Sequence, residues 1–222
     1  MACTNRDTIK VAARNGIGAL AFSFVDPDEA KSWVDVYYDI IRSDECVPLG
    51  HTVNANIALV TGFSLHEDRA EAIRRGQEGF EFFGYALNAL VAHDQVPGRT
   101  DLWGEFQARR SADSVERKIA AADEQGESFA SCIGTPADAS RYLRQMRDVG
   151  VDQVIFIQQA GRNAHADICS SLELFASDVM PEFAADEAER SARKAADFAP
   201  FVEAALARKT WMQPLADADI PV

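Results

Sequence analysis

The sequence lacks the patterns that mark metal-dependent and disulfide-stabilised proteins. It holds four cysteines, Cys3, Cys46, Cys132 and Cys169, and four histidines, His51, His66, His93 and His165. The cysteines form no C-x-x-C pair, and the histidines form no H-E-x-x-H motif. We therefore expect the cysteines to be reduced packing residues and expect no metal centre, which argues against a metal hydrolase.

Basic residues are also scarce, with 22 Lys and Arg against 35 Asp and Glu, a net charge of −13. A surface of this sign repels phosphate, so we expect neither nucleic acid nor an anionic membrane as a partner. No apolar run reaches the ~20 residues that cross a bilayer, and the N-terminus lacks the pattern of a secretion signal. These absences favour a cytoplasmic protein.

Self-sufficient catalytic motifs are missing as well. The sequence contains no G-x-x-x-x-G-K-[ST] phosphate loop, no G-x-S-x-G nucleophile turn and no glycine-rich dinucleotide fingerprint after a strand. Function must therefore come from residues that the fold brings together.

The sequence does contain a repeating order of apolar run, helix cap and amphipathic helix. Apolar, β-rich runs predict strands at 17–25, 56–63 and 151–158, with the end of a further strand at 1–3. Because amphipathic helices separate these runs, the pattern predicts a parallel sheet.

Cap and stop residues place the predicted helices. Asp26, Ser64 and Thr135 stand where an N-cap side chain is expected, and the first and third are followed by proline at the first helical position. Gly16 ends the first helix, and we expect Pro181 to stop the helix that contains SSLELFASDVM.

The strand count leaves two architectures open. A closed parallel barrel needs eight strands, so the chain is either the second half of a TIM (β/α)8 barrel or a small open α/β sheet. We expect one unit over 1–183, with an excursion at about 93–131, and a helical, partly exposed tail over 184–222.

In α/β folds, ligands bind beyond the carboxyl ends of the strands. The segments 2–5, 22–25, 61–64 and 158–163 occupy those positions and carry neutral hydrogen-bonding and aromatic groups, which suit holding a cofactor better than hydrolysis. The first segment, ACTNRDT, begins a helix and could bind a phosphate through its backbone N–H groups. The residues alone favour plain helix capping there.

Several segments, taken in order, resemble a known family. IGTPADASRYLRQMRDVGVDQVIFIQQAG followed by ICSSLELFASDVMPEF is similar to the last βα units of the bacterial luciferase-like flavin-dependent monooxygenases. ACTNRDTIKVAARNGIGALAFSF resembles that family's fifth strand end, the next helix and the sixth strand, and PGRTDLWGEF resembles part of its late excursion. The resemblance covers roughly 1–183 and concerns the family's carboxyl-terminal half only.

This resemblance implies a TIM barrel that binds reduced FMN, or F420 in related branches, and uses O2 to oxidise a small organic substrate. Thr4 and Asn5 match the position that contacts the flavin phosphate, which reverses the preference for plain capping. The other cofactor-binding positions implied are Phe22, Ser23 and Phe24 at the end of strand six, and Gln158, Gln159 and Gly161 in the last-strand loop, where ordinary loop structure is the alternative.

The family's first four strands, which bring the residues usually assigned to catalysis, have no counterpart here, so no catalytic residue is identified. We expect a truncated reading frame, with Met1 an internal methionine, or a half that functions by pairing. Expected partners are the substrate, O2, a flavin reductase, and a second copy or the missing half. The alternatives are a non-catalytic flavin-binding or interaction α/β protein, and a small α/β fold without flavin.

Overall fold

The computed structural model describes residues 1–21, 25–91, 96, 98–110, 116–117, 119–120 and 131–211. The strands in these ranges are β1 Ala2–Cys3, β2 Ala19–Ala21, β3 Ile57–Leu65, β4 Cys132–Gly134 and β5 Gln153–Ile157. The helices are α1 Arg6–Arg14, α2 Pro27–Arg42, α3 Arg69–Val91, α4 Leu102–Arg109, α6 Pro136–Asp148, α7 His165–Asp178, α8 Met180–Ala184 and α9 Glu187–Ala207.

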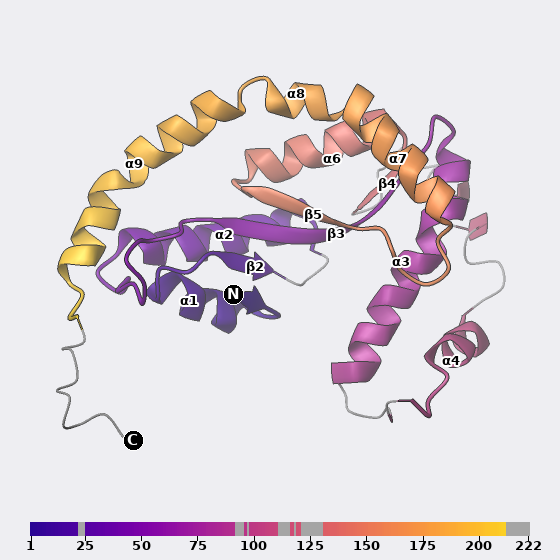
Figure 1. The fold of residues 1–222 in the computed structure, drawn as a ribbon, viewed down its shortest axis with the longest axis horizontal. Helices are drawn as coiled ribbons and strands as arrows, with labels where there is room; N and C mark the ends of the chain where they lie inside the picture. The colour runs from indigo at the N-terminus through magenta and orange to yellow at the C-terminus, as the bar shows by residue number, and fades with distance from the viewer. Residues whose placement is uncertain are drawn as a thin grey trace, which may run out of the picture.

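The five strands form one parallel sheet around β3 (Figure 1). β1 pairs with β2, and β2 pairs with the first residues of β3, so that Ala21 lies beside Leu59. On β3, the pairing with β5 includes Leu59 beside Val154, and β4 pairs with its last residues, Phe63 beside Cys132. The parallel βα units expected from the alternation are confirmed.

The two faces of β3 pack against different helices. Leu59, Phe63 and neighbouring residues on one face join the main apolar core, which takes its helical side chains from α1, α2, α6, α7 and α9. The other face meets α3 closely, because a Cβ added at Gly62 would lie 2.7 Å from the Phe80 ring. β3 is buried along its whole length, as expected for a central parallel strand with both faces covered.

Local helix signals are confirmed at most of the predicted positions. Asn5, Asp26 and Thr135 each accept a hydrogen bond from a backbone N–H in the first turn of α1, α2 and α6. Gly16 and Gly150 follow α1 and α6 with φ values of +62° and +94°. This left-handed conformation suits glycine and ends a helix.

Other predictions were wrong. Ser64 lies inside β3, and Asp68 begins α3 instead by accepting a bond from the Glu71 N–H at 3.1 Å. Pro181 lies in the first turn of α8 rather than ending a helix. The strand β4 and the helix α4 were not expected. β4 has three residues and α4 has eight, so neither is long enough to produce a clear periodic pattern.

The carboxyl-terminal helix α9 lies along the outside of the molecule, at the end opposite to α3 and α4 (Figure 1). Phe198 and Ala205 are buried, and the Phe198 ring packs against Tyr38 of α2 at 5.1 Å. Lys194 donates to the Tyr38 hydroxyl at 2.6 Å and also bonds Asp152. None of the described helices is long and apolar enough to span a membrane.

Candidate functional site

The first part of the candidate site is the amino-terminal end of α1, directly after β1. Asn5 Oδ1 accepts the Thr8 N–H at 3.0 Å, and the Thr8 hydroxyl accepts the Asn5 N–H at 3.4 Å. Thr4 and Asn5 are exposed, and Arg6 bonds the Ser32 hydroxyl at 2.8 Å. The capping box therefore fixes the start of the helix, and the positive end of the helix dipole faces solvent.

The second part is the loop between β5 and α7. Gln158 is half-buried, and its side-chain Oε1 is buried without a hydrogen-bond partner among the described residues. Its backbone carbonyl accepts a bond from Asn163 Nδ2 at 2.8 Å, which holds the loop closed. Gln159 is exposed. A buried amide oxygen without a donor is costly, so Gln158 suits a ligand that brings an N–H or O–H group.

Helix α3 holds the same loop from the other side. A Cβ added at Gly79 would lie 2.2 Å from Asn163 Oδ1, and one added at Gly161 would lie 3.0 Å from the Trp103 ring. Gly161 has φ +58°, and the Arg162 guanidinium lies 4.9 Å from the centre of the Trp103 ring. The loop is therefore packed between α3 and α4, and its glycine is required by conformation as well as by space.

The remaining predicted positions, Phe22, Ser23 and Phe24, lie outside the described residues. The start of α1 and the β5–α7 loop nevertheless lie at the same edge of the sheet, because β1 and β5 are parallel and both end there. β2 and β3 lie between them, so β1 and β5 are about 14 Å apart across the sheet at the usual strand spacing.

An ion pair at the same edge was not predicted. Arg69, the first residue of α3, donates two bonds to the Asp138 carboxylate, at 2.8 and 2.7 Å, and Thr135 and Arg141 also bond this carboxylate. Burial of Asp138 opposes its ionisation, but these bonds outweigh burial and lower its pKa. The pair fixes the starts of α3 and α6 against each other. The only sign of this ion pair in the sequence is that Asp138 stands three residues after Thr135, at capping-box spacing.

The cysteines differ in their surroundings. Cys3, Cys46 and Cys132 are buried, and burial raises the pKa of each thiol. Cys169 is also a free thiol but is only half-buried, with its Sγ 3.5 Å from His165 Nε2 one helical turn earlier. No group of three or more metal-ligating side chains occurs in the part of the chain that the structure describes.

Three hollows lined by described residues lie along α9, near the amino-terminal ends of the strands. One of about 400 Å³ lies between β5, α6 and the α8–α9 joint, and another of about 640 Å³ lies between α9 and residues 52–56. A third, of about 320 Å³, adjoins Tyr38 and Asp152. Sequence patterns gave no sign of these hollows, because they depend on how the tail docks.

Comparisons with known proteins find similarity in structure. No protein-family model and no curated protein matches the sequence. The chain is similar to the monooxygenase RslO1 from Streptomyces bottropensis, with a TM-score of 0.52 and 17% identity over 82% of this chain and 47% of that chain. It is similar to apo-MsnO8, with a TM-score of 0.51 and 19% identity over 80% of this chain and 49% of that chain. A coenzyme F420-dependent tetrahydromethanopterin reductase from Methanopyrus kandleri matches at a TM-score of 0.48 and 20% identity, over 82% of this chain and 50% of that chain.

At these identities the similarity concerns the fold. The chain spans about half the length of the structures that it matches. Together with the parallel sheet, this confirms the predicted fold class, α/β with parallel (β/α) units that form part of a TIM barrel and a helical carboxyl-terminal tail.

Proposed function

We propose that this chain is part of a luciferase-like flavin-dependent monooxygenase, corresponding to the carboxyl-terminal half of the barrel. The observation that carries the proposal is the fold shared with a monooxygenase, combined with a capped, solvent-facing helix start at the edge where such barrels bind ligands. The sequence resemblance over 1–183 supports the same assignment.

The residues at this edge suit a flavin. The backbone N–H groups at the start of α1 would bind the phosphate, with Thr4 and Asn5 beside it. The buried Gln158 Oε1 would accept a bond from a flavin N–H or hydroxyl group, and Gln159 and Gly161 would shape the loop. Phe22, Ser23 and Phe24 are proposed as the wall that excludes water from the ring.

FMN is the proposed cofactor, with F420 as the alternative. When bound, a reduced flavin supplies the electrons that activate O2 for oxidation of a small organic substrate. The chain's own residues would place the ring and exclude water. The polar groups of Thr4, Asn5, Gln158 and Gln159 do not titrate at neutral pH, so any catalytic acid or base would come from elsewhere.

The proposed function also involves partners. Parallel strands at the edge of a sheet leave backbone groups unpaired and invite another chain, and the matched structures are about twice as long. We propose that a second copy or a separate amino-terminal half closes the barrel, and that a flavin reductase delivers reduced cofactor. A non-catalytic flavin-binding role is the second candidate, favoured by the neutral chemistry of the edge.

The test is to titrate the purified protein with FMN and with F420 while measuring its mass in solution. The proposal predicts binding of one of the two flavins, and substrate-dependent consumption of reduced flavin by the assembled dimer or hetero-complex. Flavin binding without consumption in any assembly would favour the second candidate. A folded monomer that binds neither cofactor would contradict both.

A further inference from the structure

A second candidate site lies under the joint between α8 and α9, on the face of β5 that packs against α6 and α7. Its cavity of about 400 Å³ takes Val154 and Phe156 from β5, and volumes of 300–1,000 Å³ are usual for small-molecule sites. Asp152 and Gln153, which precede and begin β5, border it, whereas Gln158 follows the strand's other end. The cavity is therefore separate from the proposed flavin edge.

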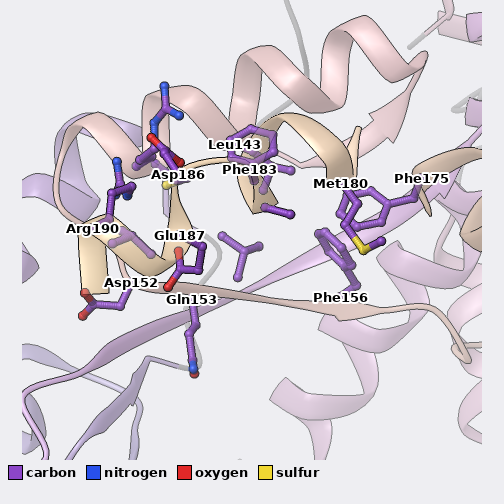
Figure 2. A pocket seen from close by; sticks show the side chains of 15 residues that line it. Leu143, Asp152, Gln153, Phe156, Phe175, Met180, Phe183, Asp186, Glu187 and Arg190 are labelled. Atoms are coloured by element: carbon purple, nitrogen blue, oxygen red, sulfur yellow. The ribbon is translucent and has the colours of Figure 1, made fainter. Parts of the chain in front are cut away.

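The floor of the cavity is apolar and rich in aromatic rings. It is formed by Leu143, Met146, Phe156 and Phe175, and the roof adds Met180 and Phe183 of α8. Figure 2 shows Phe156, Phe175 and Met180 gathered at one end. The rings of Phe156 and Phe175 lie 5.1 Å apart at 78°, an edge-to-face arrangement. None of the floor side chains carries a hydrogen-bond donor, and the methionines can adjust to a guest ring.

The charged groups lie at the other end of the cavity, where Figure 2 shows Asp152, Glu187 and Arg190. Asp186 and Arg147 also line it. Asp152 is paired with Lys194 of α9, so the acidic and basic groups around this end balance. This end of the cavity therefore carries no net charge. Because the protein as a whole has a net charge of −13, the cavity does not attract an anion.

Two ion pairs hold the roof in place. Arg144 of α6 donates to both Glu182 oxygens of α8 at 2.6 Å, and Lys194 of α9 pairs with Asp152 just before β5. The Arg147 guanidinium also lies 5.5 Å from the centre of the Phe183 ring. These contacts tie both sides of the α8–α9 joint, the roof of the cavity, to α6 and to the residue before β5.

We propose that this cavity binds an uncharged aromatic molecule of two or three rings, with its rings among Phe156, Phe175 and Phe183 and a hydroxyl or carbonyl group at the polar end. Stacking on these rings and displacement of water from an apolar floor favour such a ligand. This inference does not depend on the proposed flavin chemistry.

The experiment uses the uncharged fluorophore N-phenyl-1-naphthylamine as the probe, with 2-naphthol and 2-naphthoate as competitors. We expect saturable binding of the probe and displacement by 2-naphthol at concentrations at least tenfold lower than by 2-naphthoate. Ala184→Phe, at the end of α8, fills the cavity and should weaken probe binding at least tenfold. Met180→Lys, which brings a charge to the aromatic end, should weaken it at least fivefold.

The matched control is Ala199→Phe on α9, which lines the separate 640 Å³ hollow and should change probe affinity less than twofold. Thermal unfolding of each variant checks that it is folded. Unchanged binding in both Ala184→Phe and Met180→Lys would overturn the proposal. Equal loss in Ala199→Phe, equal displacement by 2-naphthoate, or displacement by FMN would also overturn it.

Discussion

The two edges of the sheet are built differently. At the carboxyl edge, Asp138 is buried and bonded by several donors, and α3 meets the β5–α7 loop through a glycine with no room for a side chain. At the amino edge, α9 docks through Phe198, Ala205 and Lys194, and Arg208 just past its end bonds the Ser43 and Cys46 carbonyls. Hollows of 320–640 Å³ nevertheless remain beside the helix. The first edge is therefore closely packed, whereas the second leaves hollows along α9.

The largest effect should follow from Asp138→Ala. It leaves the Arg69 guanidinium and the Thr135 N–H without the buried carboxylate, and breaking a buried pair costs about 3–5 kcal/mol. Chemical denaturation measures this change in the free energy of unfolding. Asp148→Ala, at an exposed residue of the same helix, should cost less than about 0.5 kcal/mol. Equal effects would mean that the carboxyl edge is not specially stabilised.

The pH dependence of the same carboxylate sharpens this point. Because the folded-state pKa of Asp138 lies below its usual value of about 3.9, the carboxylate's contribution is fully present above that value. It is lost as the pH falls through the folded-state pKa. The stability difference between the native protein and Asp138→Asn should therefore be constant from about pH 6 to 5 and shrink below about pH 4. A difference that does not change with pH would contradict the assigned pKa direction.

Two glycines of α3 test the close packing of the loop. Gly79→Ala places a methyl group 2.2 Å from Asn163 Oδ1 and 2.5 Å from the Ala160 carbonyl oxygen, and overpacking of this kind costs about 1–3 kcal/mol. Gly84→Ala, in the same helix with open space around it, should instead stabilise the protein by about 0.5–1 kcal/mol. Thermal unfolding of the two variants should show midpoint shifts of opposite sign; shifts of the same sign would contradict the packing.

The amino edge should respond less to substitution. Lys194→Met removes the bonds to Asp152 and Tyr38, but Asp152 keeps its bonds from Tyr38 and from the Ile57 N–H. We expect a loss of about 1 kcal/mol, measured by denaturation, because the lysine is one-third exposed. Arg193→Met, at the neighbouring exposed position, is the control. A loss above that of Gly79→Ala would reverse the comparison between the two edges.

The smallest change in stability, and one of opposite sign, is expected for Gln158→Met. It removes a buried oxygen that has no partner among the described residues, so stability should stay constant or rise by up to about 1 kcal/mol. FMN affinity should nevertheless fall severalfold, measured by quenching of flavin fluorescence. A stability loss without a change in affinity would show that Gln158 is only a loop residue.

Features that depend on residues close together in the sequence could be predicted, and features that depend on distant residues could not. The caps Asn5, Asp26 and Thr135 act within three residues, so the sequence displays them directly. The pairs Arg69–Asp138 and Lys194–Asp152 join residues 69 and 42 positions apart, and no local pattern reveals them. Both edges depend on such contacts. The candidate site was thus predictable as a set of strand ends, but not the way in which α3 and Asp138 hold those ends.

Ser64 illustrates a second reason. Its spacing to Glu67 imitates a capping box, but β3 continues to Leu65 because its residues are buried in the sheet, and tertiary burial overrides local propensity. Asp68, four residues later, supplies the cap instead, and α3 begins at Arg69.

A flavin phosphate bound at the start of α1 can be detected by comparing the affinities for FMN and riboflavin in the native protein and in Asn5→Asp. Asparagine and aspartate cap helices about equally well, and a negative charge suits a helix N-terminus, so stability should not fall. The added negative charge nevertheless repels a phosphate. We predict that the native protein binds FMN at least tenfold more tightly than riboflavin, and that Asn5→Asp removes this preference without weakening riboflavin binding. Equal native affinities for the two ligands, or a preference that survives in Asn5→Asp, would contradict this prediction.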